Sequence, residues 1–213
     1  MFNTLTEQKV SILAGTVMLE GNLVIPRSCR SVVIFAHGSG SSMHSPRNRF
    51  VAGMLQEEGI GTLLFDLLTP FEDAVYANRF NIDLLTERLK ASTHWLQNRP
   101  AAAGLPLGYF GASTGSAAAL RAAAEMGPVV RAVVSRGGRP DLAGPSLSRV
   151  TAPVLFIVGG DDSPVLELNQ QAYGMINADK DLAIVPHATH LFEEPGALAE
   201  VARLAVAWFR QRL

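Results

Sequence analysis

The sequence predicts an α/β fold, with a mostly parallel, twisted sheet and helices on both faces. From residue 31 onward, apolar runs of strand length alternate with longer amphipathic segments, which is typical of parallel strands joined by crossover helices. Glycine-punctuated apolar stretches precede this alternation. The chain has 213 residues, 48% apolar and 17% charged, which suffices for one hydrophobic core. We therefore expect a single domain over residues 1–213.

The elements follow in order along the chain. Antiparallel strands are expected at residues 10–14, 17–19 and 22–25, which Gly15 and Gly21 separate. Parallel strands are predicted at residues 31–36, 61–65, 105–110, 130–135, 153–158 and 182–185. Helices are predicted at residues 47–58, 81–97, 114–126, 165–176 and 196–212, the last after Pro195, a common helix start. The connection at residues 136–150, rich in Gly, Pro and Arg, predicts at most a short helix.

Composition and charge narrow the function classes. The net charge of -1 implies no basic face, so nucleic acid is not an expected partner. The apolar runs are much shorter than the about 18 residues of a membrane helix, so we expect no membrane contact. Residues 1–7 lack the pattern of a secretory signal and the single Cys29 cannot form an internal disulfide, which together favour a cytoplasmic protein. Monomer and homodimer both remain open.

The segment Gly111-Ala112-Ser113-Thr114-Gly115 joins a predicted strand to a predicted helix. A serine between two glycines at such a turn is typical of a nucleophile elbow, in which a strained backbone exposes the hydroxyl above the sheet. A purely structural glycine-rich turn is the alternative. We interpret Ser113 as a candidate nucleophile.

A serine nucleophile needs a base and a group that orients the base. Asp162 follows the predicted strand at 153–158, and His190 follows the one at 182–185. Because the carboxyl ends of parallel strands meet at one edge of the sheet, both can reach Ser113. The chain order Ser, Asp, His is the order of the elbow-type hydrolases.

Other assignments remain open for the acid and the base. Asp162 could instead be the N-cap of the next helix, and His190 could be a loop histidine without a catalytic role. Asp161 and His187 form the fallback pair, and Asp141 is a more distant substitute for the acid.

Two backbone donors are expected to form the oxyanion hole. One is the N–H of Thr114, directly after the nucleophile. The second is the N–H of Ser39 in the glycine-rich loop at residues 37–42. His37 in this loop is either a second base, a substrate contact, or, as we favour, a residue that holds the loop through hydrogen bonds.

These segments, together with Ala188-Thr189-His190-Leu191-Phe192, resemble the α/β-hydrolase superfamily, specifically its dienelactone hydrolase-like branch. The resemblance implies a serine hydrolase acting on a small ester, lactone or thioester, with Ser113 as nucleophile, Asp162 as acid and His190 as base. Dienelactone hydrolases themselves use a cysteine nucleophile, so general serine esterase chemistry is the expectation here. No metal-ligand cluster or phosphate loop is present in the sequence, so neither a metal nor a cofactor is expected.

The loop after residues 130–135 is short, so we expect a minimal lid and a small, soluble acyl substrate. Arg136 and Arg139 lie near the catalytic edge; either they bind a carboxylate or phosphate of the substrate, or they pair with Asp141 or loop carbonyls. Arg79, with Phe71 and Phe80, is a further candidate for the pocket wall. A catalytically silent binding module and an acyltransferase with the same nucleophile are the rival functions.

Overall fold

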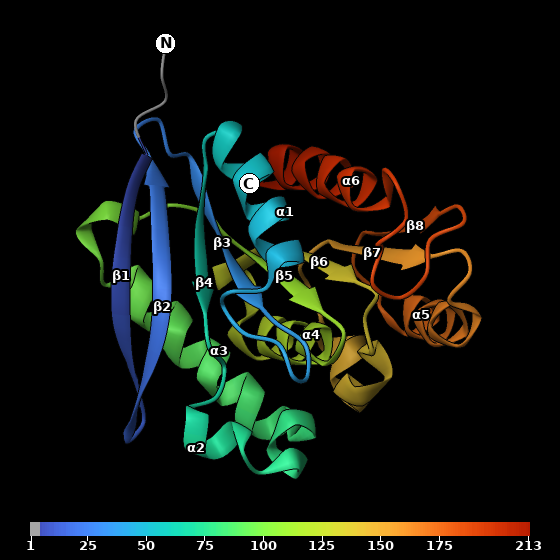
Figure 1. Ribbon diagram of the computed structural model, residues 1–213, viewed down its shortest axis with the longest axis horizontal. Helices are drawn as coiled ribbons and strands as arrows, with labels where there is room; N and C mark the ends of the chain where they lie inside the picture. Colours follow the sequence, from blue (N-terminus) through green and yellow to red (C-terminus); the bar gives the residue numbers. More distant parts are fainter. Residues whose placement is uncertain (1–4) are drawn as a thin grey trace.

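The computed structural model describes residues 5–213 and contains an eight-stranded sheet with helices on both faces (Figure 1). The strands are β1 (Leu5–Ala14), β2 (Val17–Pro26), β3 (Ser31–Ala36), β4 (Ile60–Phe65), β5 (Leu107–Ala112), β6 (Val130–Arg136), β7 (Val154–Gly159) and β8 (Lys180–Val185). Their order across the sheet is β1-β2-β4-β3-β5-β6-β7-β8.

Strands β3 to β8 are paired in parallel, whereas β1 and β2 form an antiparallel hairpin whose second strand joins β4. In β3, β4, β5 and β7 every residue is buried, because helices cover the sheet on both sides. The predicted α/β architecture with N-terminal antiparallel strands is confirmed.

The helices form two layers. Helices α1 (Pro46–Glu57) and α6 (Ala197–Arg212) pack together on one face, above the sheet in Figure 1. Helices α3 (Ile82–Gln97), α4 (Thr114–Met126) and α5 (Ser163–Met175) cover the other face. Each layer has its own buried apolar cluster against the sheet, as expected for a central sheet with two apolar faces. No helix within residues 5–213 is long and apolar enough to cross a membrane.

The N-terminal strands differ from the prediction. Residues 17–26 form one continuous strand, because Gly21 is a point of close approach and not a turn. A Cβ at Gly21 would lie 2.9 Å from the Cβ of Phe65 and 3.1 Å from the carbonyl oxygen of Leu64. Glycine here lets β2 and β4 pack closely.

Two connections contain short helices. Between β4 and α3 lie α2 (Pro70–Asp73), closed by a capping box from Thr69 and Glu72, and the 3₁₀ turn Tyr76–Phe80. Between β6 and β7 lies the 3₁₀ segment Pro140–Arg149, which is kinked at Gly144. Nothing larger is inserted after β6, in agreement with the minimal lid expected from the sequence.

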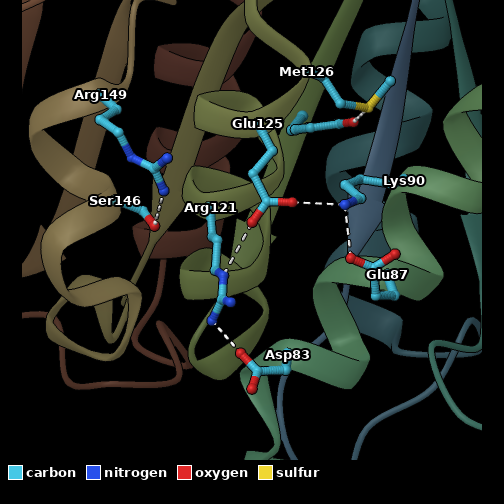
Figure 2. Close-up of polar contacts among 9 residues, drawn as sticks. Asp83, Glu87, Lys90, Arg121, Glu125, Met126, Ser146 and Arg149 are labelled. Atoms are coloured by element: carbon cyan, nitrogen blue, oxygen red, sulfur yellow. Dashed lines mark hydrogen bonds and ion pairs between the residues drawn. The ribbon is translucent and has the colours of Figure 1, made fainter.

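Ion pairs join α3 to α4 on the surface (Figure 2). Lys90 Nζ on α3 lies 2.6 Å from Glu125 Oε2 on α4 and 2.7 Å from Glu87 Oε1. Arg121 bonds Glu125 within α4 and forms an ion pair with Asp83 at the start of α3. This network helps to hold α4, whose first residue follows Ser113.

Candidate active site

Ser113 stands at the turn between β5 and α4 in a strained backbone conformation, with φ 50° and ψ -122°. Neighbouring segments hold this conformation. The Ser113 N–H donates to the carbonyl of Arg136 at 3.2 Å, and the Ser113 carbonyl accepts from the N–H of Ser116 and of Arg139, each at 3.1 Å. The turn is therefore anchored both to its own helix and to the end of β6.

The glycines of the elbow are required by close contacts. A Cβ at Gly111 would lie 2.5 Å from the Cα of Ser116, inside the turn. A Cβ at Gly115 would lie 2.2 Å from the carbonyl oxygen of Ala36 and 2.4 Å from that of His37, so α4 could not approach β3. The glycines two residues before and after Ser113 thus let the elbow form against the sheet.

The structure brings Asp162 and His190 together. The Nδ1 atom of His190 lies 2.7 Å from Oδ2 of Asp162, although the residues are 28 positions apart. Asp162 occupies the N-cap position of α5, but its side chain makes no capping bond there. Because the protonated Nδ1 faces the carboxylate, Nε2 carries the lone pair that a general base needs.

His190 lies over the turn that anchors the elbow. A Cβ at Gly137 would be 3.6 Å from the Cε1 atom of His190 and 3.1 Å from its carbonyl oxygen. Gly137 follows Arg136, whose carbonyl accepts the Ser113 N–H. Within residues 5–213 Ser113 Oγ makes no direct hydrogen bond to the imidazole; such bonds are often long without substrate and shorten in the reacting complex.

The fallback residues are not paired in this way. Within the described chain, Asp161 and His187 share no hydrogen bond, and His187 is exposed with φ 58°. Asp141 is held by Arg139. Of the carboxylates considered from the sequence, Asp162 has the geometry to orient a histidine.

The contacts of His37 fit one of the three roles considered for it, that of holding the loop through hydrogen bonds. Its Nε2 accepts the N–H of Leu67 at 3.0 Å, and its Nδ1 lies 3.0 Å from the carbonyl oxygen of Gly38, to which it donates. Burial lowers the pKa of His37, which keeps the ring neutral. With both nitrogens occupied by the backbone, His37 fixes the loop after β3 and has no ring nitrogen free to act as a base or to bind substrate.

The loop after β3 contacts the elbow directly. A Cβ at Gly38 would lie 2.9 Å from the Cβ of Ser113. The N–H of Ser39 donates to the side-chain Oγ1 of Thr114 at 2.9 Å, a contact that the sequence analysis did not predict. The N–H of Thr114 is at the first position of α4, where no preceding turn offers a carbonyl.

Comparison with known proteins places this geometry in a family. The model of the dienelactone hydrolase family matches residues 56–211. The chain belongs to the dienelactone hydrolase family. It is 54% identical to a dienelactone hydrolase from Anabaena variabilis of known structure, covering 98% of this chain and 99% of that one with a TM-score of 0.95. The expected resemblance is confirmed, and the described residues have the α/β-hydrolase fold of this family.

Two further similarities are more limited, the first in the share of the relatives that is covered and the second in sequence identity. Two proteins of Mycobacterium tuberculosis, provisionally named phosphoribosyl transferases, are 57% identical over 209 residues, which are 98% of this chain and 47% of theirs. The chain thus spans about half the length of these curated relatives. A dienelactone hydrolase-like promiscuous phosphotriesterase from metagenomic libraries is 18% identical, covers 98% of each chain and has a TM-score of 0.80, which shows the fold alone.

In this family member, two of the three candidate arginines are neutralised by carboxylates. Arg139 donates to both oxygens of Asp141 at 2.9 and 2.8 Å. Arg79 does the same with Asp73, at 2.9 and 2.7 Å. The pairing of Arg139 with Asp141 is the alternative considered from the sequence, and it leaves neither arginine as a free anion site.

Arg136 has a different environment. It is 4% exposed, has no carboxylate partner in the described chain, and makes one long hydrogen bond of 3.4 Å to Asn48 Oδ1. Its guanidinium lies 5.8 Å from the ring of Phe192, two residues after His190. Burial, with the charge of Arg47 nearby, lowers the pKa of Arg136 to about 10.

The remaining candidates of the pocket wall are exposed. Phe71 is 90% exposed, and Phe80 packs against Tyr76 at a centroid distance of 5.3 Å.

Sequence reasoning missed Asn169, a fully buried residue of α5 whose Nδ2 donates to the carbonyl of Gly138 at 2.9 Å. A polar residue on the buried face of a predicted helix was the available signal. No cluster of three or more potential metal ligands occurs in the part of the chain that the structure describes.

Proposed function

We propose that this protein is a serine hydrolase that cleaves a small ester, lactone or thioester through an acyl-enzyme. The observation that carries the proposal is the 2.7 Å bond between His190 Nδ1 and Asp162 Oδ2 beside the strained elbow of Ser113. A carboxylate that orients a histidine near a serine is the arrangement that activates a hydroxyl at neutral pH.

The reaction follows from these roles. His190 Nε2 removes the hydroxyl proton as Ser113 Oγ attacks the acyl carbon, and Asp162 stabilises the resulting imidazolium. The carbonyl oxygen becomes an oxyanion at the N-terminus of α4, where the Thr114 N–H and the helix dipole favour negative charge. The tetrahedral intermediate then expels the alcohol or thiol, which takes the proton from His190. Water repeats the sequence on the acyl-enzyme and releases the acid.

The surroundings support a small, neutral acyl substrate. The segment after β6 contains only the 3₁₀ stretch Pro140–Arg149, too little to form an apolar lid. Arg79 and Arg139 are each paired with an aspartate, so they offer little to an anionic substrate. The name of the Mycobacterium tuberculosis relatives carries little weight for this chain, because the match leaves about half of those proteins free to hold that activity.

A panel of p-nitrophenyl esters with neutral and anionic acyl groups tests the proposal. We expect the short neutral esters to be cleaved, and Ser113→Ala to abolish cleavage with little change in the thermal unfolding temperature, because the half-buried Ser113 hydroxyl makes no hydrogen bond within the described residues. Arg139→Ala should leave the ratio of neutral to anionic rates unchanged. Full activity in Ser113→Ala would refute the mechanism, and an inactive folded wild type would favour the silent binding module.

Added alcohol or amine acceptors separate hydrolysis from acyl transfer in the same assay. If water is the acceptor, a nucleophilic alcohol at millimolar concentration leaves the yield of free acid unchanged. If the acyl group passes to the alcohol instead, a new ester accumulates and the protein is an acyltransferase with the same nucleophile.

A further inference from the structure

The peptide group between Gly38 and Ser39 is fixed by hydrogen bonds to both its carbonyl oxygen and its N–H. Its carbonyl oxygen lies 3.0 Å from His37 Nδ1 and accepts the N–H of Ser41 at 3.1 Å. Its N–H donates to Thr114 Oγ1 at 2.9 Å. Because a trans peptide is planar with its C=O and N–H pointing in opposite directions, fixing the carbonyl also fixes the direction of the N–H. The Ser39 N–H is therefore aimed at the Thr114 hydroxyl.

The Thr114 hydroxyl still has a proton to donate. A hydroxyl offers one donor and two acceptor positions, and the Ser39 N–H occupies one acceptor position. Within residues 5–213 the hydroxyl donates to no protein acceptor, although Thr114 is 3% exposed. Buried hydroxyl donors normally have partners, so this one is suited to a group that arrives with the substrate.

The position of Thr114 indicates which group that is. Thr114 directly follows Ser113, and its own N–H at the start of α4 has no intrahelical carbonyl. It also lines a cavity of about 10 Å³, with room for about one atom, together with residues 38–40, Asp73 and Arg79. Ser113 does not line this cavity, but Gly38 does, and a Cβ at Gly38 would lie 2.9 Å from the Cβ of Ser113. The N–H and the hydroxyl of one residue, next to the nucleophile, can both face an atom bonded to the carbon that Ser113 attacks.

We propose that the Thr114 hydroxyl, rather than the Ser39 N–H, is the second donor to the oxyanion in the reaction proposed above, on which this inference rests. The Ser39 N–H binds the hydroxyl oxygen and polarises it, and the hydroxyl donates its hydrogen bond to the oxyanion without transferring the proton. Hydrogen bonds in such a chain strengthen one another in a poorly solvated site. His37 is a positioning residue, because it acts through the Gly38–Ser39 peptide.

Two substitutions at the same position test the proposal. Thr114→Val is nearly isosteric and removes the hydroxyl, so we expect kcat to fall about 100-fold with KM little changed, as for loss of one oxyanion donor. Thr114→Ser keeps the hydroxyl and should retain kcat within about threefold. If the Ser39 N–H is itself the donor and Thr114 only occupies it at rest, Thr114→Val frees that N–H and kcat stays constant or rises. That result would overturn the proposal.

A crystal structure of the wild type after reaction with a fluorophosphonate avoids any folding defect of the variants. The phosphonyl oxygen stands in for the oxyanion, and we expect Thr114 Oγ1 about 3 Å from it, with the Ser39 N–H still on Thr114 Oγ1. A phosphonyl oxygen bound to the Ser39 N–H, with Thr114 Oγ1 out of reach, contradicts the proposal while leaving Ser113 as the nucleophile. Failure of Ser113 to react instead refutes the proposed function, and this inference with it.

Discussion

Replacing Arg136 by methionine should stabilise the protein, because its guanidinium is buried without a carboxylate partner. Burial and the charge of Arg47 lower the pKa of Arg136 to about 10. A lowering of this size means that the charged guanidinium destabilises the folded state by about 3 kcal/mol. The contact with Phe192, 5.8 Å from the ring centroid, offsets about 1 kcal/mol, and the 3.4 Å bond to Asn48 offsets less. Methionine fills most of the same space, so we expect a net gain of about 1–2 kcal/mol.

Urea unfolding of the wild type and the variant measures this gain, and thermal unfolding should show a rise of about 2–8 °C for a chain of this length. Arg139→Met is the matched control: both members of the pair Arg139–Asp141 are partly exposed, so the change should be a loss of at most about 1 kcal/mol. A loss of more than about 1 kcal/mol in Arg136→Met would refute the reasoning and indicate that Arg136 has an anionic partner. A raised KM for anionic esters in this variant would assign that partner to the substrate.

Three further results are expected. Asp162→Asn should lower kcat by about 10³–10⁴-fold, whereas Asp161→Asn should leave it within about threefold, because Asp162 and not Asp161 bonds His190; equal losses in steady-state kinetics would contradict the assignment. Gly115→Ala should lose at least about 3 kcal/mol in urea unfolding, because the new methyl group meets two carbonyl oxygens, whereas Gly53→Ala in α1 meets nothing within 4 Å and should gain about 0.5–1 kcal/mol. Wild-type stability of Gly115→Ala would show that the elbow relaxes at little cost. Hydrogen bonding to its lysine partner lowers the pKa of Glu125, so the group stabilises the fold above the ordinary carboxyl value of 4.5 and loses this effect as the pH falls through the lowered value. Glu125→Gln should therefore destabilise by about 0.5–1 kcal/mol at pH 7 and progressively less as the pH falls below 4.5, and an effect that does not change with pH would count against the ion pairs.

Much of the fold could be predicted because its signals are local. Strands buried on both faces, such as β3 and β5, are continuous apolar runs, and the elbow needs glycine at position 111 because the Cα of Ser116, five residues on, leaves no room for a Cβ. Gly21 was misread for the opposite reason. Its glycine is required by a strand that is far along the chain, so the local pattern resembles a turn.

The details of the site depend on contacts between distant segments. The bond between the Ser39 N–H and Thr114 Oγ1 joins residues 75 positions apart, and no periodicity or spacing predicts it. Pairing of Arg139 with Asp141 could be considered from the sequence because the residues are adjacent on one loop. The burial of Arg136 could not be predicted from the sequence, because it depends on how α1 and the segment after His190 pack over the end of β6.

The proposed reaction requires Ser113 to be an activated nucleophile. Reaction with a fluorophosphonate probe, followed by mass mapping of the peptides, measures this directly. We predict that the probe modifies Ser113 in the wild type and that His190→Ala, folded as shown by its circular dichroism, is not modified. A folded wild type that takes up no probe, or His190→Ala labelled at Ser113 as fast as the wild type, would contradict this mechanism.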